Sequence, residues 1–442
     1  MAAAGVRAAG VPAVGAPAAS SGSRHAGQRF DILPMANGEC LRLGSDGRLS
    51  GPYAGASGFL SALEQWWIAL RTSEAAAALP FTGGWLLYLG YELVAEIEPR
   101  LRLPPSSDPV VALAIRAPAA WVRDRATGQA WLIAEPGYES LLDEFETRVR
   151  ELRELACGRG VDFPVHGTSF QIEEDEAGTF LAAVRRALEY VAAGDVYQAN
   201  LSRGWQATPS IALDPVTIYR RLRATNPSPF AALLRYEDLA LLSSSPERLV
   251  SIRGNTVSTR PIAGTRPRGA TAQADAALIS SLLGNEKERA EHVMLIDLER
   301  NDLGRVCAGG SVRVDEYMSI ETYAHVHHIV SNVSGRLRND VTPVDVIRAL
   351  FPGGTITGCP KVRCMELIAE LEGIGRGAYT GSIGYLNRDG SCDLNILIRT
   401  ITARNGVFKF RAGAGIVADS VPEQELAETR AKAEGLLRAL AT

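Results

Sequence analysis

Apolar residues recur at helical spacing in several stretches of the chain. They lie three or four positions apart between Phe180 and Val191, which predicts an amphipathic helix, and Gly194 supplies a typical stop after it. Pro215 and Pro343, each preceded by a capping residue, predict two further helix starts. Three other helices are predicted from apolar or mixed runs, over residues 57–70, 141–156 and 422–440.

Runs typical of strands lie mainly in the second half of the chain. They cover residues 230–236, 239–244, 311–314, 379–386, 393–402 and 407–413. A turn that contains Asn405 and Gly406 is expected to join the last two runs. Because strands are consecutive in places and helices intervene irregularly, the pattern predicts an α+β fold with large antiparallel or mixed sheets.

Composition divides the chain into three parts. Residues 1–27 are rich in Ala, Gly, Pro and Ser, and such residues offer little apolar area to offset ordering entropy, so we expect a disordered tail. The lack of acidic residues there leaves an organelle transit peptide as a second interpretation. A segment with Gly and Pro near residues 158–168 indicates a boundary between an N-terminal region, 28–165, and a second region, 166–442.

The bulk composition is that of an ordinary soluble globular protein. The chain has 442 residues, is 46% hydrophobic and carries a formal charge of −4, with its 46 basic residues dispersed, which argues against nucleic acid as a partner. No stretch approaches the roughly 18 apolar residues of a membrane span. Six cysteines without a CxxC pair indicate reduced thiols and a cytoplasmic location.

Four glutamates occur as two pairs with helical spacing. Glu288 and Glu291 lie three positions apart on a probable helix, and Glu425 and Glu428 repeat this spacing on the last one. Each pair therefore shares one helix face. Four carboxylates on two helices form the oxygen-donor set that Mg²⁺ prefers, although a solvated surface face is the alternative interpretation for either pair alone.

Donor groups for an anionic ligand lie in three other segments. The glycine-rich run Arg411–Ser420 follows a strand and suggests a concave backbone nest for an anion. The run Phe351–Lys361 places glycines and Thr355 before a predicted helix, whose N-terminus attracts negative charge. Arg399, on a predicted strand, has the planar fork that suits a carboxylate. Ordinary tight turns are the alternative for each glycine-rich run.

Three neighbouring histidines invite a metal-site interpretation. They are His325, His327 and His328, and no cysteine or helical HExxH motif accompanies them. We therefore interpret them as core or substrate-facing histidines.

The motifs that follow Gln171 have the order found in one enzyme family. They include SSPERL, PIAGTRPRG, AEHVMLIDLERNDLGRV, HHIVSNVSG, GGTITGCPKVRCMELI and GAGIVADS. This part of the chain resembles the chorismate-utilising enzymes, which comprise component I of anthranilate synthase and of aminodeoxychorismate synthase, and the isochorismate and salicylate synthases. PFTGGWLLYLGYELVAEIEP resembles their N-terminal region. The resemblance implies the anthranilate synthase component I fold, a β-sandwich flanked by helices to which the N-terminal region adds strands.

The resemblance also implies a role for each matched position. Glu291 and Glu428 match the principal Mg²⁺ ligands of the family, and Glu288 and Glu425 match the neighbouring carboxylates. Glu247 matches the general acid that protonates the departing C4 hydroxyl, a poor leaving group. The other positions matched to the substrate or to catalysis are Thr265, His328, Thr355, Lys361, Tyr379, Arg399, Gly413, Ala414 and Gly415.

Two positions bear on the nucleophile and the product. Isochorismate and salicylate synthases carry a water-activating lysine where this chain has Gln198, so glutamine favours an ammonia-using enzyme. Ala263 stands where well-known aminodeoxychorismate synthases carry a lysine that attacks C2, and alanine here is typical of anthranilate synthases. The motifs VYQANLS, HHIVS and GSIGYL nevertheless resemble the aminodeoxychorismate branch.

These comparisons imply component I of an aminodeoxychorismate synthase. Such an enzyme converts chorismate and ammonia to 4-amino-4-deoxychorismate, the precursor of p-aminobenzoate and folate, with Mg²⁺ as cofactor. Anthranilate synthase component I is the alternative. Because no glutaminase pattern surrounds Cys157, we expect ammonia to come from glutamine on a separate amidotransferase subunit.

Overall fold

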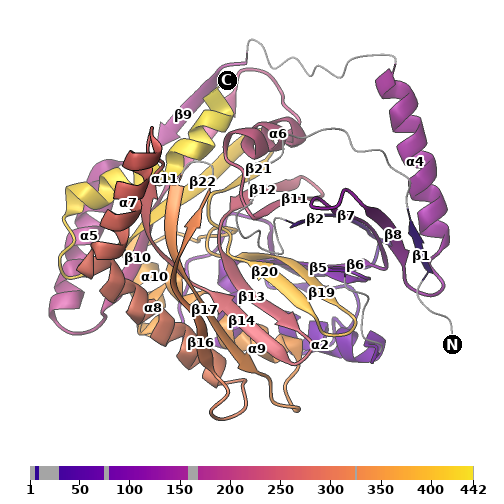
Figure 1. The fold of residues 1–442 in the computed structure, drawn as a ribbon, viewed down its shortest axis with the longest axis horizontal. Coiled ribbons are helices and arrows are strands. Elements are labelled where there is room, and N and C mark those ends of the chain that lie inside the picture. Colours follow the sequence, from indigo (N-terminus) through magenta and orange to yellow (C-terminus); the bar gives the residue numbers. More distant parts are fainter. Residues whose placement is uncertain (1–4, 9–28, 74–78, 158–167, 324–325, 442) are drawn as a thin grey trace.

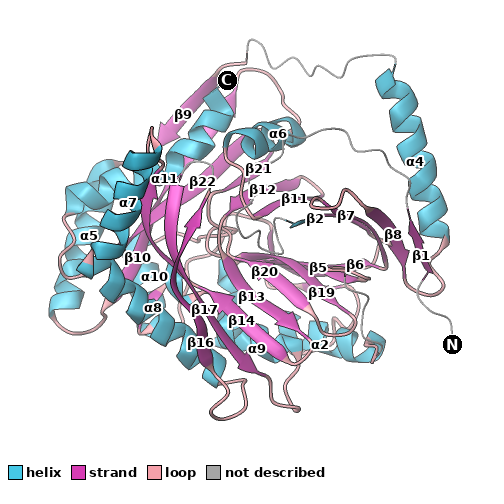
Figure 2. Cartoon of the chain, viewed as in Figure 1, coloured by secondary structure: helices cyan, strands magenta, loops and turns pink. Residues whose placement is uncertain are grey.

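The fold consists of three sheets with helices around them (Figures 1 and 2). The computed structural model describes residues 5–8, 29–73, 79–157, 168–323 and 326–441. Neighbouring strands within these ranges pair antiparallel throughout. This mixture of helices and antiparallel sheets confirms the predicted α+β class.

The largest sheet has eleven strands and draws on both regions of the chain. Its strands are β3 (Cys40–Gly44), β4 (Leu49–Ser50), β5 (Gly84–Leu89), β6 (Val110–Ala117), β13 (Arg248–Arg253), β14 (Thr256–Arg260), β15 (Ile262–Pro267), β16 (Arg313–Thr322), β17 (Val326–Arg336), β19 (Ser382–Asn387) and β20 (Cys392–Asn395). Strand β5 pairs with β19, and this pairing joins the N-terminal strands to the C-terminal half. The N-terminal region thus extends the core sheet, as the family resemblance implies.

A second sheet of seven strands packs on the first. Its strands are β9 (Phe170–Glu174), β10 (Gln198–Pro209), β11 (Phe230–Tyr236), β12 (Leu239–Ser245), β18 (Gly358–Cys359), β21 (Thr400–Arg404) and β22 (Val407–Ile416). Tyr88 and Leu113 of the eleven-stranded sheet share one buried cluster with Leu234 and Leu241 of the second sheet. This shared apolar layer makes the two sheets a sandwich.

A third sheet contains four strands, β1 (Gly5–Ala8), β2 (Phe30–Met35), β7 (Ala119–Asp124) and β8 (Ala130–Ala134). Strand β1 differs from the expected disordered tail, because Gly5 to Ala8 pair with β8. The unpaired backbone N–H and C=O groups of an edge strand can bond to another strand whatever side chains that strand carries. Composition therefore does not reveal such pairing. The rest of the expected tail, residues 1–4 and 9–27, lies outside the described residues.

The helices are α2 (Phe59–Leu70), α3 (Val94–Ile97), α4 (Ser140–Cys157), α5 (Ala177–Ala192), α6 (Pro215–Thr225), α7 (Ala272–Gly284), α8 (Glu286–Gly304), α9 (Pro343–Leu350), α10 (Lys361–Glu372) and α11 (Pro422–Ala441), with short 3₁₀ turns η1 (Tyr91–Leu93) and η2 (Gly354–Ile356). Both proline-led starts are confirmed, since Asp214 caps α6 and Thr342 forms a capping box on α9. Helices α5, α10 and α11 lie together at the left of Figure 1 and contact β10 or β22.

One predicted strand proves to be two. The run 393–402 divides into β20, in the eleven-stranded sheet, and β21, in the seven-stranded sheet. The chain turns at Arg399, whose φ of 50° lies in the left-handed region. Residues on both sides of the turn are apolar because both sheets are buried there. The sequence therefore shows one uninterrupted apolar run, which predicts a single strand. The hairpin between β21 and β22 is as predicted, with φ of 50° at Asn405 and 75° at Gly406.

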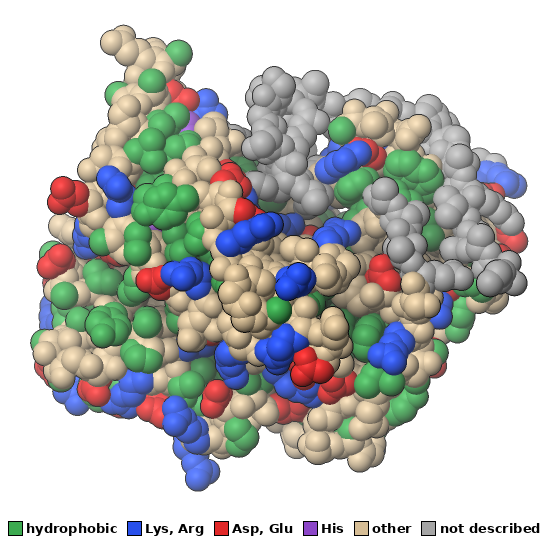
Figure 3. All heavy atoms as spheres, turned by 60° about the horizontal axis from the view of Figure 1, so that its bottom comes forward, with side chains coloured by type: hydrophobic (Ala, Val, Ile, Leu, Met, Phe, Trp, Pro, Cys, Tyr) green, Lys and Arg blue, Asp and Glu red, His purple; other side chains and the backbone are tan. Residues whose placement is uncertain are grey.

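The surface and the remaining predictions can be placed briefly. Basic and acidic side chains lie interspersed over the face drawn in Figure 3. None of the helices in the described residues is long and apolar enough to cross a membrane. The cysteines whose side chains are described are free thiols. The proposed boundary near 158–168 falls almost wholly on residues that the structure does not describe.

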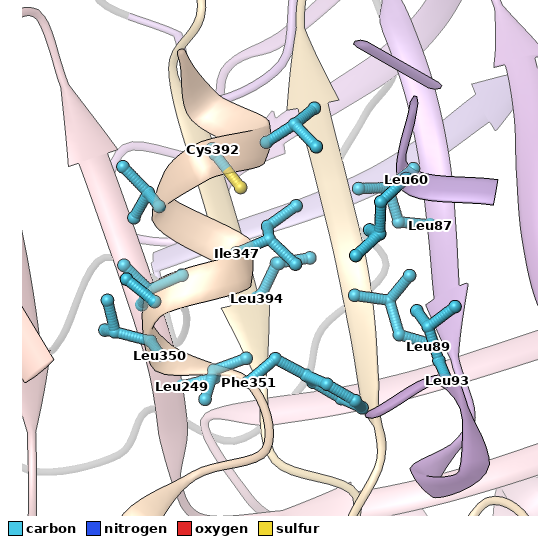
Figure 4. Close-up of a cluster of buried hydrophobic side chains, with 14 of the residues drawn as sticks. Leu60, Leu87, Leu89, Leu93, Leu249, Ile347, Leu350, Phe351, Cys392 and Leu394 are labelled. Atoms are coloured by element: carbon cyan, nitrogen blue, oxygen red, sulfur yellow. The ribbon is translucent and has the colours of Figure 1, made fainter. Parts of the chain in front are cut away.

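The main core lies between α9 and the eleven-stranded sheet, with α2 at its side (Figure 4). Ile347 and Leu350 of α9 face Leu249 of β13 and Leu394 of β20, and each of these side chains is buried. Phe351, at the end of α9, is 2% exposed in the same cluster. The packing fixes the start of the 351–361 loop, which carries η2 to the candidate site.

Candidate active site

Glu247 lies in the turn between β12 and β13 and is 6% exposed. Its backbone N–H donates to Ser245 Oγ at 3.3 Å, and its carbonyl accepts from Ile396 N at 3.0 Å. Burial raises the pKa of the carboxyl group to about 7, against the lowering effects of Thr355, Lys432 and Arg399. The side chain can therefore hold a proton near neutral pH, as a general acid must.

His328 and Thr265 form a hydrogen-bonded pair across β15 and β17. The His328 Nδ1 and the Thr265 Oγ1 are 2.9 Å apart, and the two residues are partners in the strand register. Burial and, to a smaller extent, the nearby Arg399 together lower the pKa of His328 to about 4, so the ring is neutral at physiological pH. A neutral imidazole can donate or accept a hydrogen bond to a ligand without adding charge.

Arg399 supplies the positive charge next to Glu247. Burial lowers the pKa of the guanidinium group, while the carboxyl group of Glu247 raises it. Within the described residues we find no ion pair or side-chain hydrogen bond of Arg399. A half-buried guanidinium without an ion pair in the described chain, on a strained turn, suits the capture of a carboxylate.

Several buried polar atoms at this place have no hydrogen-bond partner within the described chain. They are Glu247 Oε1, Glu288 Oε2, His328 Nε2 and Thr355 Oγ1. Folded proteins pair the great majority of their buried polar groups, so such a group of orphan atoms indicates a binding site for a polar ligand.

The glycine-rich segment at the end of β22 differs from its predicted form. Gly413, Ala414 and Gly415 lie within the strand and pair with β10, so the segment is not a concave loop. A Cβ atom on Gly415 would lie 2.5 Å from Gln198 Nε2, and one on Gly413 would lie 2.6 Å from Tyr379 Oη. The glycines therefore leave room for two candidate site residues; a strand satisfies the backbone groups that a nest would have exposed.

Lys361 is the predicted site residue that the structure does not bring to the others. Its Nζ forms an ion pair with Asp302 at 2.5 Å and donates to the carbonyl of Leu350 at 3.0 Å. It lines a surface cavity together with Tyr197 and Met365. The start of α10 thus faces this cavity, and the sequence could not show which way the helix points.

The four predicted metal-ligating glutamates share one electrostatic neighbourhood. Burial raises the pKa of Glu291, and Glu288, Glu428 and Glu425 raise it further. Two of the four already have cationic neighbours, because Glu288 contacts Arg266 of β15 at 2.7 Å and Glu428 contacts Lys432, one turn further along the same helix, at 2.7 Å.

The donor set fits a hard divalent cation in part. No three His, Cys, Asp or Glu side chains of the described chain come together closely enough to hold a metal ion by themselves. The buried Oε2 of Glu288 is nevertheless unpartnered, and all four donors are carboxylate oxygens. Mg²⁺ typically takes one or two protein carboxylates and completes its shell with water and an anionic ligand, so the arrangement is compatible with it.

Ala263 lies on β15 opposite Ile329 and is half-buried. The register then shifts at Gly264, whose φ is 66°, and Thr265 comes opposite His328. A Cβ atom on Gly264 would lie 2.6 Å from Glu288 Oε2, so only glycine allows this close approach of α8. The PIAGT motif thus joins the histidine to the predicted metal ligands, and residue 263 adds no polar group.

Lys432 is a candidate site residue that the sequence interpretation missed. Its Nζ donates to the carbonyl of Gly413 at 3.0 Å and pairs with Glu428 at 2.7 Å, and its charge lowers the pKa of Glu247. The available signal was its position one helical turn after Glu428. Of the three histidines, His327 is fully buried and its Nε2 lies 2.8 Å from Asp275 Oδ1, whereas His325 falls outside the described residues.

Comparisons with known proteins give one family. Residues 48–438 match the family model described as chorismate binding enzyme. The chain is 44% identical over 392 residues to aminodeoxychorismate synthase component 1 of Bacillus subtilis, covering 86% of this chain and 82% of that protein. It is also 44% identical over 376 residues to an anthranilate synthase component I-like protein of Synechocystis sp., covering 84% and 75% of the two chains.

A solved structure supports the same grouping. The crystal structure of anthranilate synthase component I from Streptococcus pneumoniae superposes with a TM-score of 0.80 at 31% identity, covering 97% of this chain and 95% of that one. The fold is therefore that of component I. Both kinds of component I occur among the relatives at the same identity, so identity does not separate them.

Proposed function

We propose, from the premise that this chain belongs to the chorismate-binding enzyme family, that it aminates chorismate at C4. Membership places it among the chorismate-utilising enzymes of the anthranilate or aminodeoxychorismate synthase component I type. The proposed product is 4-amino-4-deoxychorismate, which leads to p-aminobenzoate and folate.

The observation that carries the proposal is the buried carboxyl group of Glu247, whose pKa is raised to about 7. Its proton passes to the C4 hydroxyl, which leaves as water while ammonia forms the new C–N bond. Chorismate and ammonia thus give aminodeoxychorismate and water. Arg399 holds a substrate carboxylate. Neutral His328 contacts the chorismate ring and does not compete for the proton of Glu247.

Gln198 favours ammonia over water as the nucleophile. An amide does not accept a proton from water at neutral pH, so no base stands at the position where water-using members of the family carry a lysine. A Cβ atom on Gly415 would lie 2.5 Å from Gln198 Nε2, and this close approach of the two strands supports a role for the amide beside the proposed carboxylate-binding segment.

The choice of C4 over C2 rests on the motifs VYQANLS, HHIVS and GSIGYL. Ala263 supports the alternative, component I of anthranilate synthase, because it offers no amine for a covalent step at C2. If the C4 assignment is right, amination proceeds without a lysine at this position.

We propose Mg²⁺ as the cofactor, held by Glu291 and Glu428 with Glu288 and Glu425 beside them. The bound ion would neutralise a substrate carboxylate. The ammonia would come from glutamine on a separate amidotransferase subunit, and the reduced cysteines favour the cytoplasm as the location.

Product identity tests the proposal. Purified protein, chorismate, Mg²⁺ and an ammonium salt at alkaline pH are incubated with and without an aminodeoxychorismate lyase. We expect p-aminobenzoate only when the lyase is present. Anthranilate formed without lyase would instead establish C2 amination and show that Ala263 reports the product.

A further inference from the structure

Arg376 is a buried arginine between α10 and β19 that links several parts of the site. It is 4% exposed. Its Nε and Nη2 donate to the two carboxylate oxygens of Glu372 at 3.1 and 2.6 Å. Nη2 also donates to the carbonyl of Asn200 at 2.7 Å, and Nη1 donates to the carbonyl of Ile356 at 3.2 Å and to Thr380 Oγ1 at 3.4 Å.

The three acceptors other than Glu372 lie next to candidate site residues. Asn200, on β10, comes two positions after Gln198. Ile356, in η2, directly follows Thr355, and Thr380 directly follows Tyr379. Asn200 lies 176 positions from Arg376 in the sequence, Ile356 lies 20 positions away and Thr380 lies four. Arg376 is thus bonded to all three of them at once.

The contacts of Arg376 also hold a strained stretch of backbone. The guanidinium group lies over the ring of Tyr379, 5.4 Å from its centroid, and over that of Tyr91 at 5.2 Å. Thr380 has a φ of 64°, which is costly for a β-branched residue. Such a conformation persists only where neighbouring contacts over-determine it, and the bond from Arg376 is one of them.

Glu372 anchors the arginine to the second sheet. It accepts hydrogen bonds from Ser202 N at 2.8 Å, from Ser202 Oγ at 2.9 Å and from Arg411 Nη2 at 3.2 Å. Burial alone would raise the pKa of this carboxyl group, but Arg376 and Arg411 lower it, so it is ionised. The pair is complete within the protein and leaves Arg376 without an N–H group for substrate.

We propose that Arg376 is a positioning residue for the amination, which fixes Gln198, Thr355 and Tyr379 relative to one another. The inference rests on the proposed function, and it assigns the arginine an effect on turnover beyond its effect on stability. A planar fork with five donors can hold three segments in register, whereas a lysine ammonium at the same place cannot.

A matched pair of variants tests the assignment. Arg116 is 2% exposed, donates to Glu135 at 2.7 Å and to the carbonyl of Gly84 at 2.9 Å, and lies over the ring of Trp85 at 5.1 Å. It is therefore an equally buried, paired and stacked arginine in the N-terminal strands. Arg376→Lys and Arg116→Lys should both lower the melting temperature.

Only the Arg376→Lys variant should lose turnover. We expect its kcat per folded molecule to fall about 100-fold, because a displacement of about 1 Å in a reacting constellation has an effect of that size. The KM for chorismate should change by less than about threefold, since the carboxylate-binding Arg399 is untouched. An equal loss of kcat in both variants, or a raised KM with kcat unchanged, would overturn the assignment.

Hydrogen exchange gives a readout that does not depend on the reaction. The amides of Asn200 and Thr380 donate to Thr357 O at 3.0 Å and to Leu397 O at 2.8 Å. Both amides should exchange faster in Arg376→Lys and at the wild-type rate in Arg116→Lys; unchanged exchange in both would count against the inference.

The design separates the two proposals. A wild-type protein that does not aminate chorismate would refute the proposed function, and exchange would then decide the role of Arg376. If Arg376→Lys does not accumulate as folded protein, Glu372→Gln removes the anchor's charge and keeps its shape. Glu372→Gln should lower kcat and speed the hydrogen exchange of the Asn200 and Thr380 amides, as is expected of Arg376→Lys. A Glu372→Gln variant with wild-type kcat and wild-type exchange rates would refute the role.

Discussion

Burial shifts the protonation of Glu247 and of His328 toward the neutral form. The pKa of Glu247 rises to about 7 and that of His328 falls to about 4, because each side chain loses the water that stabilises its charge. The sequence identified both residues through motifs. It could not give their protonation, because the burial that shifts both pKa values arises only when distant segments of the chain pack around the two side chains. Sequence also missed Lys432, whose effect on Glu247 requires α11 to lie against β22.

The protonation of Glu247 makes a prediction at the scale of one residue. Glu247→Gln should lower kcat by about 100-fold to 10,000-fold, since it removes the proton donor. In the wild type kcat should fall as pH rises through about 7 at a fixed concentration of free ammonia, because the carboxyl group then loses its proton. The Glu247→Gln variant should show no such fall of kcat with pH. Glu299→Gln, which changes another buried acid, is the control and should keep the fall of kcat as pH rises. Near-normal turnover of Glu247→Gln would show that Glu247 is not the general acid.

At the scale of helices and strands, some boundaries can be predicted from local sequence signals alone. The last helix begins at Pro422 and the β21–β22 hairpin turns at Asn405 and Gly406, as predicted, because capping, periodicity and turn chemistry are local. The break between β20 and β21 was not predicted, because it depends on which sheet each half joins. The same limit applies to the glycine-rich end of β22, whose partner β10 lies about half the chain away.

Helices α8 and α11 make a prediction about metal dependence. Glu428→Ala should raise the Mg²⁺ concentration for half-maximal activity at least about tenfold, since it removes one of the proposed ligands and loss of even an outer ligand contact has an effect of this order. Glu434→Ala, an exposed position on the same helix that pairs with Arg438 at 3.9 Å, is the matched control. Activity would be titrated with Mg²⁺ after chelation. Coincident titration curves for Glu428→Ala and the wild type would exclude ligation by Glu428.

At the scale of the whole molecule, the fold depends on pairings that no local pattern encodes. Strand β5 joins β19 across most of the chain, and the two sheets enclose a cluster with residues from both regions. The sequence pattern predicts a strand over residues 379–386 but makes no such prediction for Gly84–Leu89, and the addition of N-terminal strands to the core follows only from the family resemblance. Glu299, on α8 beside η2, is 5% exposed, and this burial has a consequence for stability.

Glu299 should make the folded protein less stable as pH rises. Burial, and then Asp302 and Glu247, raise its pKa from the ordinary 4.5 to about 8, against the opposing effects of Lys361 and Thr259. Between these pH values the folded state binds more protons than the unfolded state, so stability is greatest below 4.5 and is lost as pH rises to about 8. The slope is about 1.4 kcal/mol per pH unit where the states differ by one proton. Glu299→Gln should therefore flatten the decline of unfolding free energy from pH 5 to 8, measured by urea unfolding. The exposed Glu434→Gln should run parallel to the wild type; a parallel Glu299→Gln curve would show that this carboxyl group does not titrate within the window.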